Sequence, residues 1–306
     1  MTFTMKNLIR MLAALTAMLC LAACTPALAA PVEGLGLVAD SEDTYIDFGA
    51  VKISDKKIDQ ITALLDAMPN LQKADMFEGR ISNENMDMLT ERYPDIEFGW
   101  TVRVGNHTLR TDQTAFSTLH NPKRDTEHGT REFYALKFCK KLEALDLGHN
   151  KITDISFLSE HKNLKVLILA CNKIKDISVL AELTELEYLE LFTNKFTDIT
   201  PLSGLTNLID LNLSNCGITD LTPLYNLPKL DRFRLCMNGL LSDEQRREFE
   251  SVYPDATVGW ATHPTGEGWR EHHRYDTIYR IFHSNVYEPF MTEPPAEDAA
   301  NEEETK

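Results

Sequence analysis

Apolar residues recur along the middle of this 306-residue chain with a fixed period of 22 positions. The consensus unit carries leucines at positions 1, 4 and 6, an asparagine at position 9, an apolar residue at position 11 and an aspartate at position 13, and the later units depart from it at Cys216, Phe233 and Ser242. The alternation of apolar and polar residues over positions 3 to 7 predicts a short strand with one buried face. The first leucines of successive units are Leu142, Leu164, Leu186, Leu208 and Leu230.

One such unit cannot bury its apolar face alone, so the repetition predicts stacked coils that share one core. A hydroxyl residue recurs after each strand, at Ser156, Ser178, Thr200 and Thr222, and is interpreted as the cap that starts a short helical or 3₁₀ turn. The expected fold is an α/β leucine-rich repeat solenoid, with short parallel strands on the concave face and helical turns on the convex face.

Irregular, helix-bearing repeats are expected at both ends of the regular ones. Residues 81–100 and 241–260 share a serine, a glutamate, Tyr-Pro-Asp and Gly-Trp at a constant offset of 160. Ser82 and Ser242 are placed to cap a helix in each copy. Because the open ends of a solenoid core must be covered, atypical terminal repeats are what stacking requires.

The pattern LxxLxLxxNxIxDIxxL at a 22-residue period resembles the internalin-like bacterial leucine-rich repeat proteins. The resemblance is strong over residues 142–240 and weaker over the irregular repeats. It implies a non-enzymatic protein that binds other proteins through its concave face.

The N-terminus predicts export. Residues 1–24 carry Lys6 and Arg10, then an apolar run too short for a stable membrane span, and end in Leu-Ala-Ala-Cys. This ending looks like a bacterial lipobox, which predicts lipidation of Cys24 and anchoring at the membrane of the bacterial cell surface. The alternative is ordinary cleavage after Ala29, which would release a secreted protein.

Composition and hydrophobic periodicity predict four further segments after residue 24. Residues 25–44 are expected to be a flexible tether, residues 45–262 the repeat domain, and residues 263–290 a helical cap on the last coil. The acidic tail, residues 291–306, is expected to be disordered.

Charge and cysteine content narrow the partners. Without residues 1–24, 29 basic and 47 acidic residues remain, a net charge of −18 that disfavours nucleic acid and anionic lipid surfaces. Four cysteines also remain, and the repeat spacing keeps most pairs too far apart for disulfides, so free thiols are expected. They are Cys139, Cys171, Cys216 and Cys236.

The outward positions of the middle coils supply the candidate binding site. An apolar and aromatic cluster is flanked there by acids and then by two arginines, and such a patch is typical of a protein interface. The alternatives are that the face carries these residues without a function, or that a flanking hairpin covers the patch; this hairpin is predicted around Gly105, with strands at residues 98–104 and 107–110. The predicted partner-binding residues are Val166, Ile168, Tyr188, Glu190, Phe192, Asp210, Asn212, Arg232 and Arg234.

An enzymatic alternative depends on Cys171 and His149, which occupy position 8 of adjacent coils. In contact they could form a thiolate nucleophile of a cell-envelope hydrolase, but the sequence offers no oxyanion site. No catalytic residue, cofactor or metal site is therefore predicted. The favoured function is a lipid-anchored surface module that binds a protein or a glycan, and a purely structural role is a third interpretation.

Overall fold

A computed structural model describes residues 31–49, 51–120, 124–260, 263–266 and 268–289. The chain forms two units, residues 1–98 and residues 99–306. The predicted lipobox and the acidic tail lie outside the described residues. Within the described part, no helix combines the length and the apolar character needed to cross a membrane.

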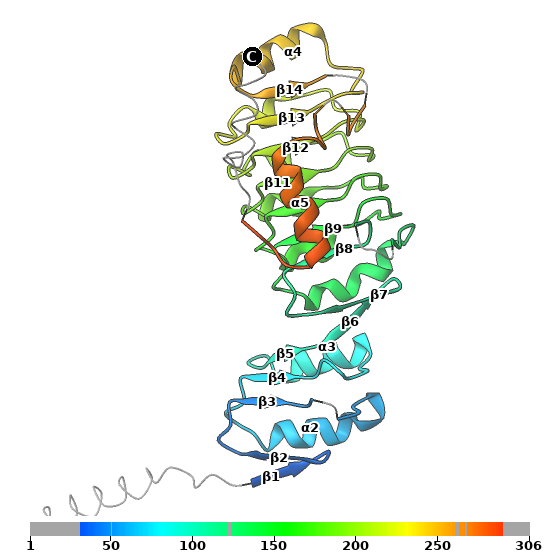
Figure 1. Cartoon of the computed structure of the whole chain (residues 1–306), viewed down its shortest axis with the longest axis vertical. Coiled ribbons are helices and arrows are strands. Elements are labelled where there is room, and N and C mark those ends of the chain that lie inside the picture. Colours follow the sequence, from blue (N-terminus) through cyan, green and yellow to red (C-terminus); the bar gives the residue numbers. More distant parts are fainter. Residues whose placement is uncertain (1–30, 50, 121–123, 261–262, 267, 290–306) are drawn as a thin grey trace, which may run out of the picture. The chain divides into compact units, whose positions relative to one another are not determined.

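The first unit contains two irregular coils (Figure 1). Its three-stranded sheet has the order β3-β4-β5, with helices α2 and α3 between successive strands. Ser82 caps α3 by accepting a hydrogen bond from the backbone N–H of Asn85, as predicted. The elements are β3 (Tyr45–Asp47), η1 (Asp55–Lys57), α2 (Ile58–Asp66), β4 (Lys73–Asp75), α3 (Asn83–Arg92) and β5 (Glu97–Gly99).

A hairpin precedes this sheet where a flexible tether was expected. Strands β1 (Pro31–Gly34) and β2 (Leu37–Asp40) pair in antiparallel register. Gly36, with a φ of +82°, supplies the left-handed backbone of the turn between them. The tether interpretation of residues 25–44 is therefore wrong for residues 31–40.

The second unit is built on a seven-stranded sheet with the order β14-β13-β12-β11-β10-β9-β8. Neighbouring strands are parallel and pair residues one repeat apart within the regular coils, for example Val166 with Tyr188 and Tyr188 with Asp210. The leucine-rich repeat solenoid is thus the observed fold. The strands are β8 (Ala115–Ser117), β9 (Ala144–Asp146), β10 (Val166–Ile168), β11 (Tyr188–Glu190), β12 (Asp210–Asn212), β13 (Arg232–Arg234) and β14 (Thr257–Gly259).

Short 3₁₀ turns and one helix form the opposite side of the second unit. Helix α4 (Asp243–Val252) is capped by Ser242 in a full capping box with Gln245, as the second irregular repeat predicted. The hairpin predicted around Gly105 is also present, as β6 (Thr101–Val104) and β7 (His107–Arg110). The 3₁₀ turns are η2 (Thr130–Phe138), η3 (Ser156–Glu160), η4 (Ser178–Glu182), η5 (Thr200–Leu202) and η6 (Thr222–Leu224).

The asparagine column holds adjacent coils together. The buried Asn172 side chain accepts from the N–H of Ile152 at 3.0 Å and donates to the carbonyls of Leu147 and Leu169, both at 3.0 Å. Cys216 occupies the same column, and its buried Sγ donates to the carbonyl of Leu191 at 3.3 Å. The four cysteines that follow residue 24 are free, as predicted.

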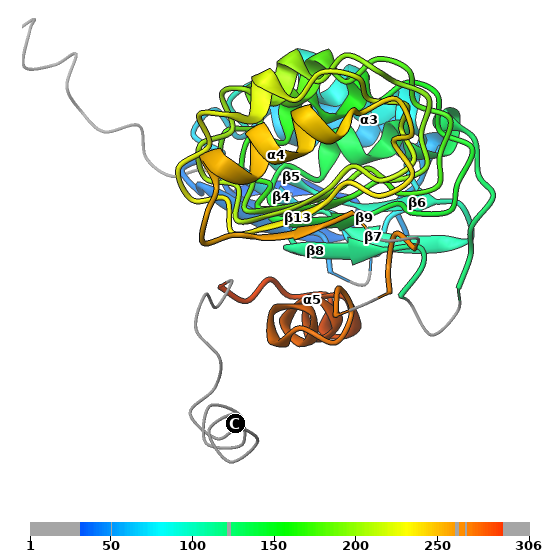
Figure 2. The same cartoon turned by 90° about the horizontal axis from the view of Figure 1, so that it is seen from above.

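The C-terminal segment, described over residues 263–266 and 268–289, turns back across the sheet. It contains α5 (His273–Ser284), which ends at Asn285 in a left-handed conformation. Figure 2 shows α5 on one side of the sheet, with the turns and α4 on the other. A helix was predicted here, but its predicted position on the last coil is wrong, because α5 crosses the strand face, from Asp210 on β12 at its start to β8 and β9.

Candidate protein-binding face

The candidate site is the strand face of the second unit, which comprises the outward-pointing residues of β8 to β13 and of the turns that follow them. Parallel register aligns the predicted site residues in two rows across the sheet. One row runs through Val166, Tyr188, Asp210 and Arg232, and the other through Ile168, Glu190, Asn212 and Arg234. The structure therefore brings these predicted residues together on one surface.

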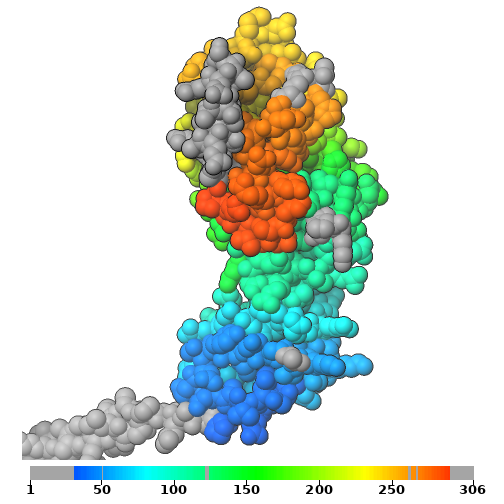
Figure 3. Space-filling view, in the orientation of Figure 1, coloured from blue at the N-terminus to red at the C-terminus, as the bar shows by residue number. Residues whose placement is uncertain are grey.

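The expectation that this surface is open is wrong. None of the nine predicted partner-binding residues is more than 6% exposed. In the space-filling view, the orange and red atoms of the C-terminal segment lie over this face (Figure 3). The alternative that the β6–β7 hairpin covers the face is also wrong, because the cover is α5 and its flanking residues. The nine residues are Val166, Ile168, Tyr188, Glu190, Phe192, Asp210, Asn212, Arg232 and Arg234.

Apolar side chains make up the middle of the contact. From the C-terminal segment, Trp269, Ile278, Ile281 and Phe282 join one buried cluster with the sheet. The strand face contributes small residues next to large ones, so the helix has room to approach the backbone. The sheet-side members of the cluster are Ala115, Ala144, Val166, Ile168, Ala170, Tyr188 and Phe192.

Glu190 is the first of two buried carboxylates that hold the C-terminal segment. Its side chain is fully buried, and it accepts from Trp269 Nε1 at 2.9 Å and from the Arg270 guanidinium at 2.9 Å. The hydroxyl of Tyr188 donates to the same carboxylate. Three donors thus compensate for the loss of water around this charge.

Asp210 is the second such carboxylate. Arg274 of α5 donates to both of its oxygens, at 2.8 and 3.2 Å, in a bidentate pair. Arg232 lies 3.4 Å from Asp210 on the neighbouring strand. Arg274 also reaches the half-exposed Asp231 at 2.5 Å. Burial raises the pKa of Asp210, and the two arginines oppose this shift.

Asn212, Arg232 and Arg234 contact the backbone of the C-terminal segment. Asn212 donates to the carbonyl of Pro264 at 2.8 Å, and Arg232 donates to that of Trp269 at 3.1 Å. The Arg232 guanidinium also stacks over the Trp269 ring, 4.4 Å from its centroid. Arg234 donates to the carbonyl of Gly266. These predicted binding residues therefore bind the chain's own C-terminal segment.

A third polar contact joins α5 to the β8–β9 end of the sheet. Asp146 is fully buried and lies 2.6 Å from Ser117 Oγ and 2.7 Å from His120 Nδ1. The other ring nitrogen of His120 lies 2.9 Å from the Tyr275 hydroxyl. Burial raises the pKa of Tyr275, so its phenol stays protonated and serves as a hydrogen-bonding group rather than a base.

The sequence did not single out the residues of the C-terminal segment that make these contacts. Trp269, Arg270 and Arg274 lie outside the repeats, so no column assigns them a neighbour. The available signal was local: two arginines four residues apart lead into the apolar face of a predicted helix. That signal indicates a polar and apolar contact surface but does not say which part of the molecule it covers.

The arrangement gives no support to the hydrolase alternative. Burial raises the pKa of the Cys171 thiol, which is the opposite of what a thiolate nucleophile requires. Cys171 interacts with Thr193, Glu190 and Arg270, and His149 with Arg124 and Asp146. Among the described residues, no group of three or more histidines, cysteines or acids is placed to hold a metal ion.

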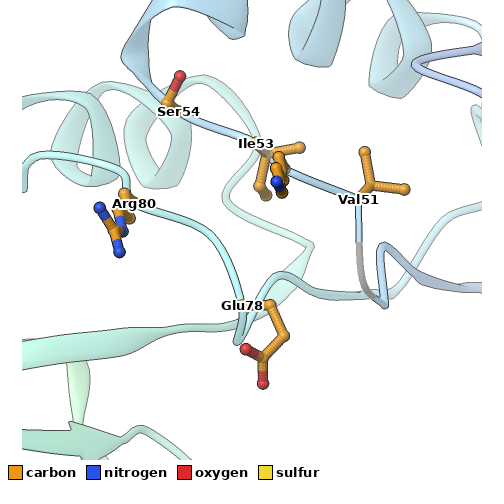
Figure 4. A pocket seen from close by; sticks show the side chains of 6 residues that line it. Val51, Ile53, Ser54, Glu78 and Arg80 are labelled. Atoms are coloured by element: carbon orange, nitrogen blue, oxygen red, sulfur yellow. The ribbon is translucent and has the colours of Figure 1, made fainter.

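A separate pocket lies in the first unit and was not predicted. Two adjacent segments, residues 51–54 and 78–80, line it with Val51, Lys52, Ile53, Ser54, Glu78 and Arg80 (Figure 4). The backbone N–H of Arg80 donates to the carbonyl of Ile53 and fixes the two segments side by side. Its lining mixes charges of both signs with aliphatic side chains, an arrangement that indicates no particular chemistry.

Comparisons with known proteins agree with the repeat architecture. Family models for leucine-rich repeats match residues 162–204, in two copies, and residues 138–155. Among curated proteins, no sequence matches this chain.

Two similar solved structures are internalins of Listeria monocytogenes. Internalin C2 is 24% identical over 71% of this chain and 80% of its own, with a TM-score of 0.41. The second, an internalin F, is 21% identical over 65% of this chain, with a TM-score of 0.42, and the match spans 51% of its length. The family-model matches, together with the parallel strands one repeat apart, identify the repeats of the second unit as leucine-rich repeats.

Proposed function

We propose that this protein is a non-enzymatic module of the bacterial cell envelope that binds another protein through the strand face of its second unit. The observation that carries the proposal is the contact with α5. This face already holds α5 and the residues just before it, by apolar packing, by the ion pair of Arg274 with Asp210 and by that of Arg270 with Glu190. A surface with these properties recognises a polypeptide, and it has the anchor residue types of protein interfaces.

The proposal is tested with the chain from residue 25 to residue 306 as bait in envelope extracts, followed by titration of any purified partner. Glu190→Gln with Asp210→Asn keeps the shape of the face and removes two charges. We expect this double variant to weaken the partner's affinity at least tenfold, since charge-assisted contacts are lost. Truncating Tyr188 and Phe192 would be less informative, because both are buried and their loss would leave cavities.

Glu182→Gln is the matched control, because Glu182 is exposed on η4, on the opposite side of the coil. It should bind the partner like the wild type. Equal affinity for all three proteins would place the partner on another surface. Failure of the wild type to bind any envelope protein saturably would remove the protein-binding function, and saturable binding of a polysaccharide instead would favour a glycan ligand.

We further propose that Cys24 is lipidated and holds the protein at the membrane of the cell surface. Support comes from the Leu-Ala-Ala-Cys ending of the apolar N-terminal run. Cys24→Ser should abolish incorporation of a labelled fatty acid and release the protein from the membrane fraction. Cys20→Ser, in the same run, should change neither. A mature N-terminus at Ala30 would instead show that the protein is cleaved after Ala29 and secreted.

A further inference from the structure

Buried carboxylates of the strand face receive cations from the C-terminal segment, while Arg232 and Arg234 of the same face donate to carbonyls of the segment. Glu190 and Asp210, on the sheet, each receive an arginine from the segment, at 2.9 and 2.8 Å. The ring of His120 links Asp146 to the Tyr275 hydroxyl. The C-terminal segment thus presents arginines to carboxylates and backbone carbonyls to arginines, so the contact is complementary in its polar groups rather than merely apolar.

The residues of the segment that touch the sheet follow helical spacing. Arg274, Ile278, Ile281 and Phe282 are separated by four, three and one positions, which places them on one face of α5. All four are buried. On the other face, Arg280 makes a surface contact with Glu288 and bonds to Thr277 within the helix. The contact of α5 therefore follows a short pattern on one helical face, and Trp269 and Arg270, which precede the helix, add the contacts with Glu190.

The polarity of the strand face is compatible with an uncovered state. Between its apolar residues it carries Asp210, Asn212, Ser214 and Arg232, which would be hydrated if the segment left. A buried ion pair gives little net stability compared with apolar packing, because both charges lose their water. The face thus differs from a permanent core, which would be filled with aliphatic side chains at the same positions.

From this complementarity we infer that the C-terminal segment stands in for a helix of the partner protein. The inferred partner helix presents arginine, then aliphatic and aromatic residues, at the spacing of Arg274, Ile278 and Phe282, preceded by a second arginine at the place of Arg270. Such a helix displaces the C-terminal segment from Glu190 and Asp210. The inference rests on the proposed function and adds the ligand's chemistry and the competitor that it must displace.

The test uses a fluorescent peptide with the sequence of residues 268–289 and the full mature chain. In the wild type the tethered segment competes at a high effective concentration, so the peptide should bind weakly. Replacing Arg270 and Arg274 with alanine weakens the tethered competitor and leaves the sheet intact. We expect the peptide to bind this variant at least tenfold more tightly than the wild type, as measured by fluorescence anisotropy.

Arg280→Ala is the matched control, since it removes an arginine on the outer face of α5, and it should bind the peptide like the wild type. We call the chain with Arg270 and Arg274 replaced by alanine the opened variant. A peptide that carries the same two replacements should bind to it at least tenfold more weakly than the unchanged peptide does. Equal binding of the two peptides, or no binding to an opened variant whose circular dichroism matches the wild type, would overturn the inference. If the opened variant fails to fold, increased hydrogen exchange of α5 in the wild type with excess peptide provides the same test, and unchanged exchange would count against it.

The same peptide separates this inference from the proposed function. A partner whose binding is abolished by the peptide supports both. A partner that binds saturably and ignores the peptide leaves the binding function in place and overturns the inference about its ligand. Tight peptide binding by the opened variant, without any saturable envelope partner, supports the ligand chemistry of the face and removes the proposed protein-binding function.

Discussion

The eighth position of each regular repeat holds its backbone in the left-handed region, whatever residue occupies it. The φ angles in this column lie between 54° and 60°, where a side chain with a β-carbon is strained. The chain leaves the strand here, and the geometry of the coil sets the angle. This shared backbone conformation accounts for Cys171 and His149 occupying equivalent positions in adjacent coils. The column comprises His149, Cys171, Thr193, Asn215 and Met237.

Met237 offers a direct test of this strain, because its side chain is 55% exposed and contributes little packing. Asparagine tolerates left-handed backbone better than other residues with a β-carbon, and Asn215 already occupies the same position one coil earlier. Met237→Asn should raise the free energy of unfolding by about 0.5 kcal/mol, measured by urea denaturation. Met237→Ala removes the same side chain but keeps the strain, so it should not stabilise. Equal effects of the two substitutions would show that backbone strain is not responsible.

Within each coil, the start of the 3₁₀ turn is stabilised by an aspartate rather than by the predicted hydroxyl residue. Asp176 Oδ1 accepts from the N–H of Ser178 at 2.8 Å, and Asp154, Asp198 and Asp220 do the same in their coils. The hydroxyl residue is the first residue of the turn, not its cap. The sequence pattern located the start of the turn correctly but assigned the cap to the hydroxyl residue, two positions after the aspartate that provides it. Aspartate, serine and threonine all favour capping positions, so the pattern alone did not distinguish them.

Asp176→Ala should therefore lower the melting temperature more than Ser178→Ala, which removes only a side-chain contact with Asp176. The hydrogen bond from the backbone of Ser178, followed by that from its side chain, lowers the pKa of Asp176 below 3.8. A lowered carboxyl pKa stabilises the fold above the unfolded value and loses this contribution as the pH falls through the folded value. The difference in melting temperature between Asp176→Ala and the wild type should thus be largest near neutral pH and shrink below about pH 4. A gap that does not depend on pH would contradict the capping role.

The strand face shows where prediction from sequence succeeds and where it stops. The columns through Tyr188 and Arg232 follow from the repeat period alone, since parallel stacking fixes each outward position. Their burial does not follow, because the cover comes from Trp269 and α5, which lie outside the repeats and far along the chain from the strands beneath them. The sequence predicted a helix within residues 263–290, but helical periodicity does not identify the surface on which a non-repeating helix packs.

At the scale of the whole molecule, the two units differ in how their strand faces are used. In the first unit, Tyr45 on β3 is 48% exposed, with Lys73 over its ring and Asp75 bonded to its hydroxyl. In the second unit, the corresponding face is buried beneath the C-terminal segment. Although the irregular repeats at residues 81–100 and 241–260 share one pattern, the added C-terminal segment distinguishes the units, and its opening would expose the face of the second.

Opening of the C-terminal segment should depend on pH through His272, the residue that caps α5. Its Nδ1 accepts from the N–H of Arg274 and must be unprotonated to do so. Burial and then the nearby Arg232, Arg274 and His273 lower the pKa of His272 to about 3, while Asp231 opposes the shift. When the segment opens, the histidine returns toward its ordinary pKa of 6.5, so the open state binds more protons between these values.

Acidification from about pH 7.5 to about pH 5 should therefore favour the open state. The opening would be measured as an increase in the hydrogen exchange of α5 relative to that of the sheet beneath it. Asp210 acts in the opposite direction at lower pH, because its raised pKa favours protonation in the closed state, so the comparison stops at the acidic end of this range. His272→Asn retains a good helix cap that cannot titrate, and the pH dependence of α5 exchange should be smaller in this variant. If wild type and variant respond alike to acidification, the opening is controlled by other groups.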